Sequence, residues 1–373
     1  MPTLRLGCLV VAVALLGAGA LPAADQQQGP LPFLVIGHRG APGVLPENTL
    51  PSFQQALAQG ANAVELDVCL TKDDRIVLWH DYKHSQAVAL VRELGLEPGM
   101  RYRPWVPDLW SKLRRPTYEL DLGQFLANYG YTLRFMPVGT QVHSRITPPT
   151  LDEFAGWAAR APGLVRFFLD VKVPDDMPDV ARRFGSACFD VLSRAGVDQK
   201  AVLMPTSRGV LTQLMSVRGG SRASFCLDHE IVSLTPDPER FGVSVEGLPE
   251  GCEYVSIGKP RIGLRPWRTF KNVVKKDLRY LKNLYQKARE RLGGERRLDL
   301  VGVQSETVAP DGPRARGQAS GVLPSNLPDA ARLIGWTIND ADEMRELMEV
   351  GVGGIVTDKV PRLVEVVGSA ATR

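Results

Sequence analysis

Side chains suited to acid–base and phosphate chemistry follow short apolar runs in the N-terminal part of the chain. His38 and Arg39 follow one run, Glu65 and Asp67 alternate along a second, and His80 ends a third. Histidine is suited to general acid–base catalysis, and arginine can hold a phosphate through two parallel hydrogen bonds. Carboxylates are the usual ligands of hard divalent cations. Together these residues predict a site that cleaves a phosphodiester.

Glu65 and Asp67 lie two residues apart in a β-rich run, so both side chains are expected on one face of a strand. Val64, Leu66 and Val68 then face the opposite side, toward a helix layer. Oxygen ligands alone favour Mg²⁺ or Ca²⁺ over zinc or copper. The alternative is that both acids lie on the solvated face of an edge strand.

A second polar pair with the same spacing, Asp170 and Lys172, follows the apolar run 165–169. Asp170 is a candidate third carboxylate ligand, and Lys172 is a candidate cation for a substrate oxygen. An ordinary ion pair in a loop is the alternative. His38 and His80 also have an alternative, as buried histidines hydrogen-bonded to the backbone.

Short apolar runs alternate with helical patterns along the chain. The predicted strands are 33–38, 63–68, 75–80, 165–171, 201–204, 222–227, 333–338 and 353–357. The predicted helices are 48–59, 178–195, 208–217, 340–350 and 360–367. This alternation is typical of a parallel sheet with crossover helices, and eight strands are compatible with a closed (β/α)₈ TIM barrel. An open doubly wound sheet is disfavoured, because no GxGxxG follows a predicted strand.

Two long stretches interrupt the alternation, and we interpret both as insertions. Residues 82–150, the first insertion, are rich in proline and aromatic residues. Residues 229–300, the second insertion, contain possible strands at 253–257 and 298–303. Since loops that follow barrel strands form the catalytic face, both insertions are expected there and would shape substrate access. The barrel domain is expected to span about residues 30–370.

The first 24 residues have the pattern of an export signal. Arg5 precedes the apolar run 6–16, and small residues follow at 18–20. The apolar run is too short to span a bilayer well. We therefore expect a signal peptide at 1–24 and an exported protein, periplasmic or extracellular. A retained N-terminal anchor is the alternative.

Composition narrows the class of protein. Hydrophobic residues make up 44% and charged residues 23%, which is ordinary for a globular protein and excludes a disordered or fibrous one. The net charge of +4 is too small to predict nucleic-acid binding. No Cys/His spacing indicates zinc, and a Cys226–Cys252 disulfide is conceivable in an exported protein.

The basic segment, residues 265–297, carries twelve Lys or Arg residues against three acidic residues. Apolar residues recur in it at helical spacing. One interpretation is the solvated outer face of an amphipathic helix. The other is a contact with an anionic membrane or with a polyanionic substrate.

The motifs resemble, in their order and residue types, those of the glycerophosphodiester phosphodiesterase family. The matching segments are His38-Arg39-Gly40, Pro46–Thr49, Glu65 with Asp67, His80-Asp81, Pro149–Glu153, Asp170 with Lys172, Gly335–Asn339 and Gly354–Asp358. The resemblance extends over about residues 33–367. It departs at Asp170, where the family usually carries Glu, so metal affinity and metal choice stay open.

The resemblance implies a metal-dependent phosphodiesterase that hydrolyses small glycerophosphodiesters to an alcohol and glycerol 3-phosphate. In the family, the glycerol 2-hydroxyl attacks first, and water then opens a cyclic phosphate. The implied roles are one Ca²⁺ or Mg²⁺ on Glu65, Asp67 and Asp170, His38 and His80 as base and acid in unassigned order, a phosphate clamp of Arg39 and Lys172, and Trp336 as an apolar wall.

Two other functions stay open. The first is a lipid phosphodiesterase similar to the sphingomyelinase D toxins, a phospholipase D-like activity at membranes that the basic segment would support. The second is a catalytically inactive barrel that binds anions or membranes.

Overall fold

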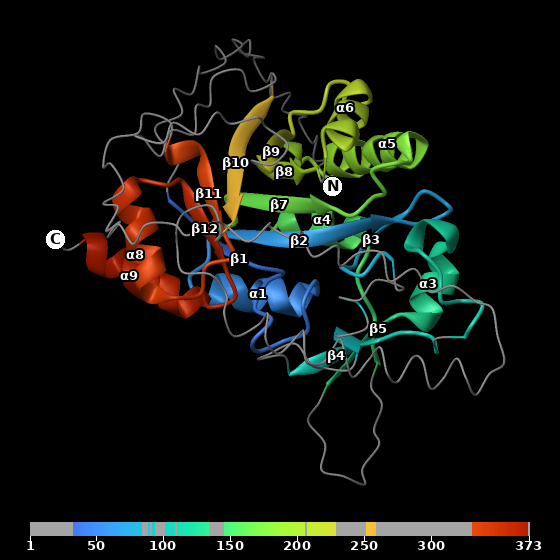
Figure 1. Ribbon diagram of the computed structural model, residues 1–373, viewed down its shortest axis with the longest axis horizontal. Helices are drawn as coiled ribbons and strands as arrows, with labels where there is room; N and C mark the ends of the chain where they lie inside the picture. Colours follow the sequence, from blue (N-terminus) through green and yellow to red (C-terminus); the bar gives the residue numbers. More distant parts are fainter. Residues whose placement is uncertain are drawn as a thin grey trace, which may run out of the picture. The chain divides into compact units, whose positions relative to one another are not determined.

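Eight parallel strands of the described residues form a closed barrel (Figure 1). They are β1 (Leu34–Gly37), β2 (Ala63–Leu70), β7 (Arg166–Val171), β8 (Ala201–Met204), β9 (Ser224–Asp228), β10 (Cys252–Gly258), β11 (Leu333–Trp336) and β12 (Gly354–Thr357). Each strand pairs in parallel with the next, and β1 pairs with both β12 and β2, which closes the ring. The predicted (β/α)₈ barrel is confirmed.

The computed structural model describes residues 33–83, 89, 92–93, 101–108, 110–133, 145–205, 207–228, 251–258 and 330–371. The expected signal peptide at 1–24 and the basic segment lie outside the described residues. Among the helices that are described, none has both the length and the apolar character that crossing a membrane requires.

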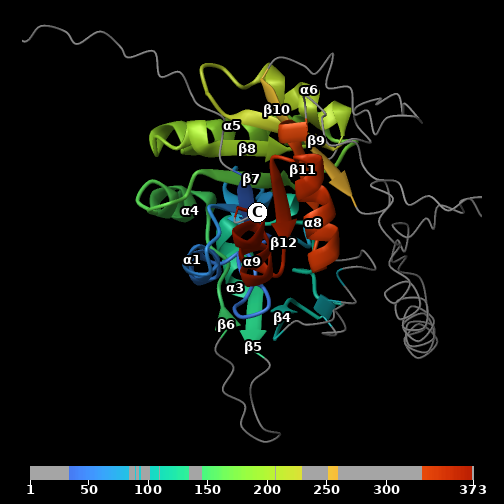
Figure 2. The ribbon, with the colours of Figure 1, turned by 90° about the vertical axis from the view of Figure 1, so that its left-hand side faces the viewer.

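Helices lie on the outside of the strands in two perpendicular views (Figures 1 and 2). They are α1 (Leu50–Ala58), α4 (Leu151–Ala158), α5 (Pro178–Arg194), α6 (Arg208–Ser216), α8 (Ala341–Val350) and α9 (Val360–Ala371), with short 3₁₀ turns at Asp198–Lys200 and Ala330–Arg332. Local signals start several of them. The hydroxyl of Thr150 accepts from the backbone N–H of Glu153 at α4, and Ser207 and Asp340 cap α6 and α8 in the same way.

The alternation along β2 separates two cores. Val64, Leu66 and Val68 pack in the large core between the strands and the helices. A second core, which includes Leu34, Ile36, Ala63, Phe168, Val202 and Val356, fills the space on the other side of the strands. Because neighbouring residues of a strand point to opposite faces, Glu65 and Asp67 point into the barrel. Both acids are completely buried, so the alternative of a solvated edge strand is wrong.

Two strand assignments from the sequence need correction. The run 75–80 forms β3 (Ile76–Leu78), which pairs antiparallel with the end of β2 and is no barrel strand. The missing barrel strand is β10, which falls inside the range expected to be the second insertion. Strand direction depends on the partner in space, and apolar content at 76–78 and 252–258 carries no information about it.

The first insertion has a small sheet of its own beside β2 and β3 (Figure 1). Its elements are β4 (Tyr102–Trp105), β5 (Gly130–Leu133), β6 (Arg145–Ile146), α3 (Leu122–Asn128) and a 3₁₀ turn at Thr117–Glu119. An aromatic core that includes Phe125, Tyr129 and Tyr131 packs around Trp79, which follows β3. The insertion is therefore joined to the barrel by apolar contact.

The four described cysteines, Cys69, Cys188, Cys226 and Cys252, are buried, and no disulfide joins any two of them. Cys226 belongs to the core inside the barrel, whereas Cys252 packs in the outer core. The conceivable Cys226–Cys252 disulfide is thus not formed.

Candidate active site

The turn after β1 presents His38 and Arg39 at the end of the barrel strand. Gly37 and Gly40 are required there by close packing: a Cβ on Gly37 would lie 2.6 Å from the carbonyl oxygen of Gly40, and Gly40 has a φ of +93°. Arg39 itself has a φ of +52°, an uncommon backbone conformation for a residue with a side chain. Its N–H donates to Oε2 of Glu65 at 2.9 Å, which holds the turn against β2.

Three carboxylates converge inside the barrel. Glu65 and Asp67 come from β2 and Asp170 from β7, where Asp67 and Asp170 are register partners. Each offers one oxygen, and these oxygens lie within 4.8 Å of one another. The structure thus brings together the three residues that the sequence proposed as metal ligands, and the shorter side chain of Asp170 reaches the cluster.

The buried oxygens of this cluster fit a hard divalent cation. Oε1 of Glu65 is buried and has no hydrogen-bond partner among the described residues. An unpaired buried carboxylate oxygen is costly, and coordination of a cation would satisfy it. Oxygen donors without sulfur or imidazole suit Mg²⁺ or Ca²⁺.

Electrostatics separate the two acids of β2. Burial and the neighbouring Asp67 raise the pKa of Glu65 to about 8. Asp67 is buried too, but Arg39, His80 and Lys172 hold its pKa well below the usual range. Nε of Arg39 lies 3.1 Å from Oδ2 of Asp67. Asp67 is therefore the compensated charge of the pair, and Glu65 is the uncompensated one.

His38 is oriented by Asp358, which directly follows the last barrel strand, β12. Its Nδ1 lies 2.6 Å from Oδ1 of Asp358, whose other oxygen accepts from the amide of Asn339 at 2.7 Å. Nε2 of His38 lies 3.9 Å from Oε2 of Glu65, so it faces the carboxylate cluster. Burial and Arg39 act to lower the pKa of His38, but Asp358 outweighs them, and the pKa lies above its usual value. The indole of Trp336 lies edge-on to His38, with ring centroids 6.0 Å apart.

His80 is held in the same manner by its neighbour. Its Nδ1 lies 2.6 Å from Oδ1 of Asp81, and since an ionised carboxylate only accepts hydrogen bonds, Nδ1 carries a proton. Burial, and then the charge of Arg39, lower the pKa of His80. The two candidate acid–base residues thus have pKa values displaced in opposite directions.

Lys172 completes the set of charges. Its Nζ lies 2.6 Å from Oδ2 of Asp170 and 3.3 Å from Oδ1 of Asp67. These carboxylates keep the pKa of Lys172 above its usual value despite burial, so the ammonium stays charged. Lys172 and Asp170 are not an ordinary ion pair in a loop, because Asp170 lies in β7 and Lys172 also contacts Asp67 of the carboxylate cluster.

Five residues that hold the site were assigned no catalytic or binding role from the sequence. Asn48 has a φ of +53°, and its amide exchanges two hydrogen bonds with Asp67, at 2.8 and 3.0 Å. Glu47 accepts from Arg39 at 3.0 Å. The histidines are positioned by Asp81, Asp358 and Asn339. The side-chain oxygen of Asn339 also accepts a hydrogen bond from the hydroxyl of Thr357. All five lie within motifs already quoted for the resemblance, which is the signal that could have found them.

Comparisons with known proteins agree with this geometry. Residues 38–159 match the model of the Glycerophosphoryl diester phosphodiesterase family. A glycerophosphodiester phosphodiesterase of Bacillus subtilis (strain 168) is 27% identical over 184 residues, covering 48% of this chain and 54% of the relative. Another, of Bacillus altitudinis, is 51% identical over 49 residues, covering 13% of this chain and 20% of the relative. The chain thus spans about half, or less, of the length of these curated relatives.

The crystal structure of a glycerophosphodiester phosphodiesterase from Parabacteroides distasonis ATCC 8503 has the same fold, with a TM-score of 0.51. It is 15% identical in sequence, and the match covers 91% of this chain and 98% of that chain. The family match includes His38, Arg39, Glu65, Asp67 and His80. The predicted resemblance of this chain to the glycerophosphodiester phosphodiesterase family is therefore confirmed.

Proposed function

We propose that the protein is a metal-dependent phosphodiesterase that hydrolyses small glycerophosphodiesters to an alcohol and glycerol 3-phosphate. One observation carries the proposal: the ligand oxygens of Glu65, Asp67 and Asp170 lie within 4.8 Å of one another inside the barrel, next to His38 and Arg39. The family match over residues 38–159 supports the same reaction.

In this proposal, the three carboxylates hold one Ca²⁺ or Mg²⁺. Such a cation, when bound, draws negative charge from the phosphate oxygens. Arg39 and Lys172 border the carboxylates and would hold the remaining phosphate oxygens with fixed positive charge. Trp336 would provide the apolar wall beside the glycerol.

His38 and His80 would move the protons. Each has Nδ1 engaged by a carboxylate, so each is left with Nε2 as the atom that exchanges a proton with substrate. Pairs of titratable groups with pKa values displaced in opposite directions are typical of acid and base partners. We propose attack by the glycerol 2-hydroxyl on phosphorus, with one histidine accepting its proton and the other protonating the leaving alcohol. Water would then open the resulting cyclic phosphate at the bond to the 2-oxygen, giving glycerol 3-phosphate.

The direct test is hydrolysis of a panel of substrates by the purified protein. Glycerophosphocholine, glycerophosphoethanolamine and glycerophosphoinositol are expected to release glycerol 3-phosphate, with activity lost in chelator and restored by Ca²⁺ or Mg²⁺. Full activity in excess chelator, with no metal retained, would refute metal dependence. Cleavage of sphingomyelin or lysophospholipids alone would favour the lipid phosphodiesterase.

Export and membrane contact are proposals that rest on sequence alone. The pattern at 1–24 supports export to the periplasm or the extracellular space. The net charge of the basic segment supports contact with an anionic surface. Both segments lie outside the described residues.

A further inference from the structure

Arg92 lies in the first insertion, outside the motifs named for the resemblance, yet it joins two parts of the site. It is 2% exposed. Its Nε donates to Oδ2 of Asp81 at 3.1 Å, and its Nη2 donates to Oε1 of Glu47. Asp81 in turn contacts His80, and Glu47 contacts Arg39. One guanidinium thus links the partner of a candidate acid–base residue to the partner of a candidate phosphate-binding residue.

The chemistry of this position calls for arginine. Glu47 and Asp81 are 2% and 5% exposed, so both bring negative charge into the interior. Loss of the guanidinium between them would remove a compensating positive charge from two buried carboxylates, which is unfavourable. Arginine stays charged, and its planar fork can reach two acceptors at fixed angles. Lysine would keep the charge but, as a point donor, would not hold both carboxylates in this geometry.

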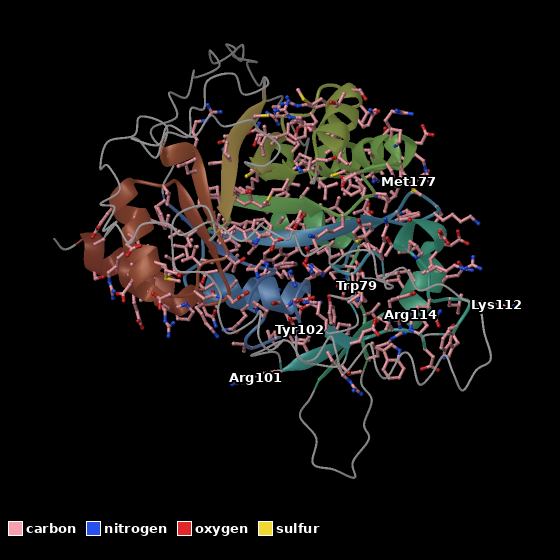
Figure 3. All side chains as sticks on the ribbon, viewed as in Figure 1. Trp79, Arg101, Tyr102, Lys112, Arg114 and Met177 are labelled. Atoms are coloured by element: carbon pink, nitrogen blue, oxygen red, sulfur yellow. The ribbon has the colours of Figure 1, made fainter. Side chains whose placement is uncertain are left out.

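The insertion also holds the same segment by packing. Trp79 directly precedes His80, and its ring lies 4.9 Å from that of Tyr131 and 5.8 Å from that of Phe125, centroid to centroid. The hydroxyl of Tyr102 donates to Oε2 of Glu47 at 3.0 Å. Figure 3 shows Trp79 and Tyr102 on the side of the molecule where the insertion meets the barrel.

We infer that Arg92 is a positioning residue: it fixes the carboxylate of Asp81, and through it the imidazole of His80, so that turnover depends on the insertion. The inference rests on the proposed function, because His80 is an acid or a base only in that reaction. Arg92 acts through Asp81 and has no assigned contact with substrate.

The test compares Arg92→Lys with the matched control Arg114→Lys. Arg114 is another arginine of the insertion, with a side chain that is 5% exposed, and its guanidinium contacts Glu93 and the carbonyl oxygen of Pro107. Arg92→Lys is expected to lower kcat roughly 10- to 100-fold, the usual effect of removing a residue that orients a functional group. Its metal requirement should stay near that of the wild type, because Arg92 binds Asp81 and Glu47 and not the three metal-binding carboxylates. Arg114→Lys should keep kcat.

A second measurement needs no turnover. The chain has five histidines, so ¹⁵N-histidine labelling gives a simple spectrum in which His80 is identified by its loss in His80→Gln. The Nδ1 proton bonded to Asp81 should resonate far downfield in the wild type and in Arg114→Lys. This signal should be lost in Arg92→Lys. It should also be lost in Arg92→Gln, a second variant with a neutral donor that serves if Arg92→Lys does not fold.

The outcomes separate the two proposals. An inactive wild type would refute the proposed function, while the His80 signal would still decide whether Arg92 positions the imidazole. An unchanged His80 signal in the Arg92 variants would overturn the inference. So would a wild-type kcat in Arg92→Lys, or an equal loss of kcat in Arg114→Lys.

Discussion

Replacement of Glu65 by glutamine should stabilise the metal-free protein and abolish its response to metal. The side chain is completely buried, and Oε1 has no hydrogen-bond partner among the described residues. Burial and the adjacent Asp67 raise the pKa of Glu65 from its ordinary value of 4.5 to about 8. Glutamine has nearly the same shape and no charge, so it removes an unfavourable buried acid.

The sign and size follow from proton linkage. A carboxyl group whose pKa is higher in the folded than in the unfolded protein lowers the free energy of unfolding as pH rises from the unfolded pKa to the folded pKa. For Glu65 this window runs from 4.5 to about 8. Since one pKa unit corresponds to about 1.4 kcal/mol, the penalty at neutral pH is about 3 kcal/mol in the metal-free wild type. The variant lacks this penalty.

Urea unfolding in EDTA, followed between about pH 5 and pH 8, measures the effect. The advantage of Glu65→Gln over the wild type should grow with pH, and added Ca²⁺ or Mg²⁺ should stabilise the wild type alone. Asp67→Asn is the control and should lower the stability of the metal-free protein, because the carboxylate of Asp67 compensates the charges of Arg39 and Lys172. The reasoning would be refuted if metal-free Glu65→Gln were less stable than the metal-free wild type at neutral pH. It would also be refuted if added metal stabilised the variant as much as the wild type.

Three further outcomes are expected. His38→Ala and His80→Ala should each lower kcat by at least ~10²-fold with little change in folding, measured by steady-state kinetics and circular dichroism; near-wild-type turnover would make that histidine structural. Asp170→Ala should weaken metal binding in calorimetric titration, whereas Asp170→Glu should be tolerated or should shift metal preference; normal binding by the alanine variant would exclude Asp170 as a ligand. If the basic segment contacts membranes, binding to anionic vesicles should weaken as salt rises from low to physiological concentration, and it should vanish when four of the segment's Lys or Arg residues are changed to Glu. A wild-type protein that does not bind anionic vesicles even at low salt would leave the segment as a solvated face.

The barrel and most of its elements were predictable from local patterns. The alternation of short apolar runs with helical periodicity reflects which side of each element meets the core, and that information is written residue by residue. The same logic placed Glu65 and Asp67 on the inner face of β2, opposite Val64, Leu66 and Val68. Candidate site residues at the ends of β1 and β7 were found because they follow apolar runs directly.

Pairing direction and long-range contacts were decided by the tertiary structure. The run at 76–78 has the composition of a barrel strand, yet it pairs antiparallel with β2. In the barrel β7 lies next to β2, and β10 is the additional strand between β9 and β11. Arg92 carries no signal in the sequence, since its role exists only where the insertion folds back between Glu47 and Asp81, 45 and 11 positions away. Local sequence determines which face of an element is apolar, but a buried charge acquires its partner from whatever chain segment the fold brings beside it.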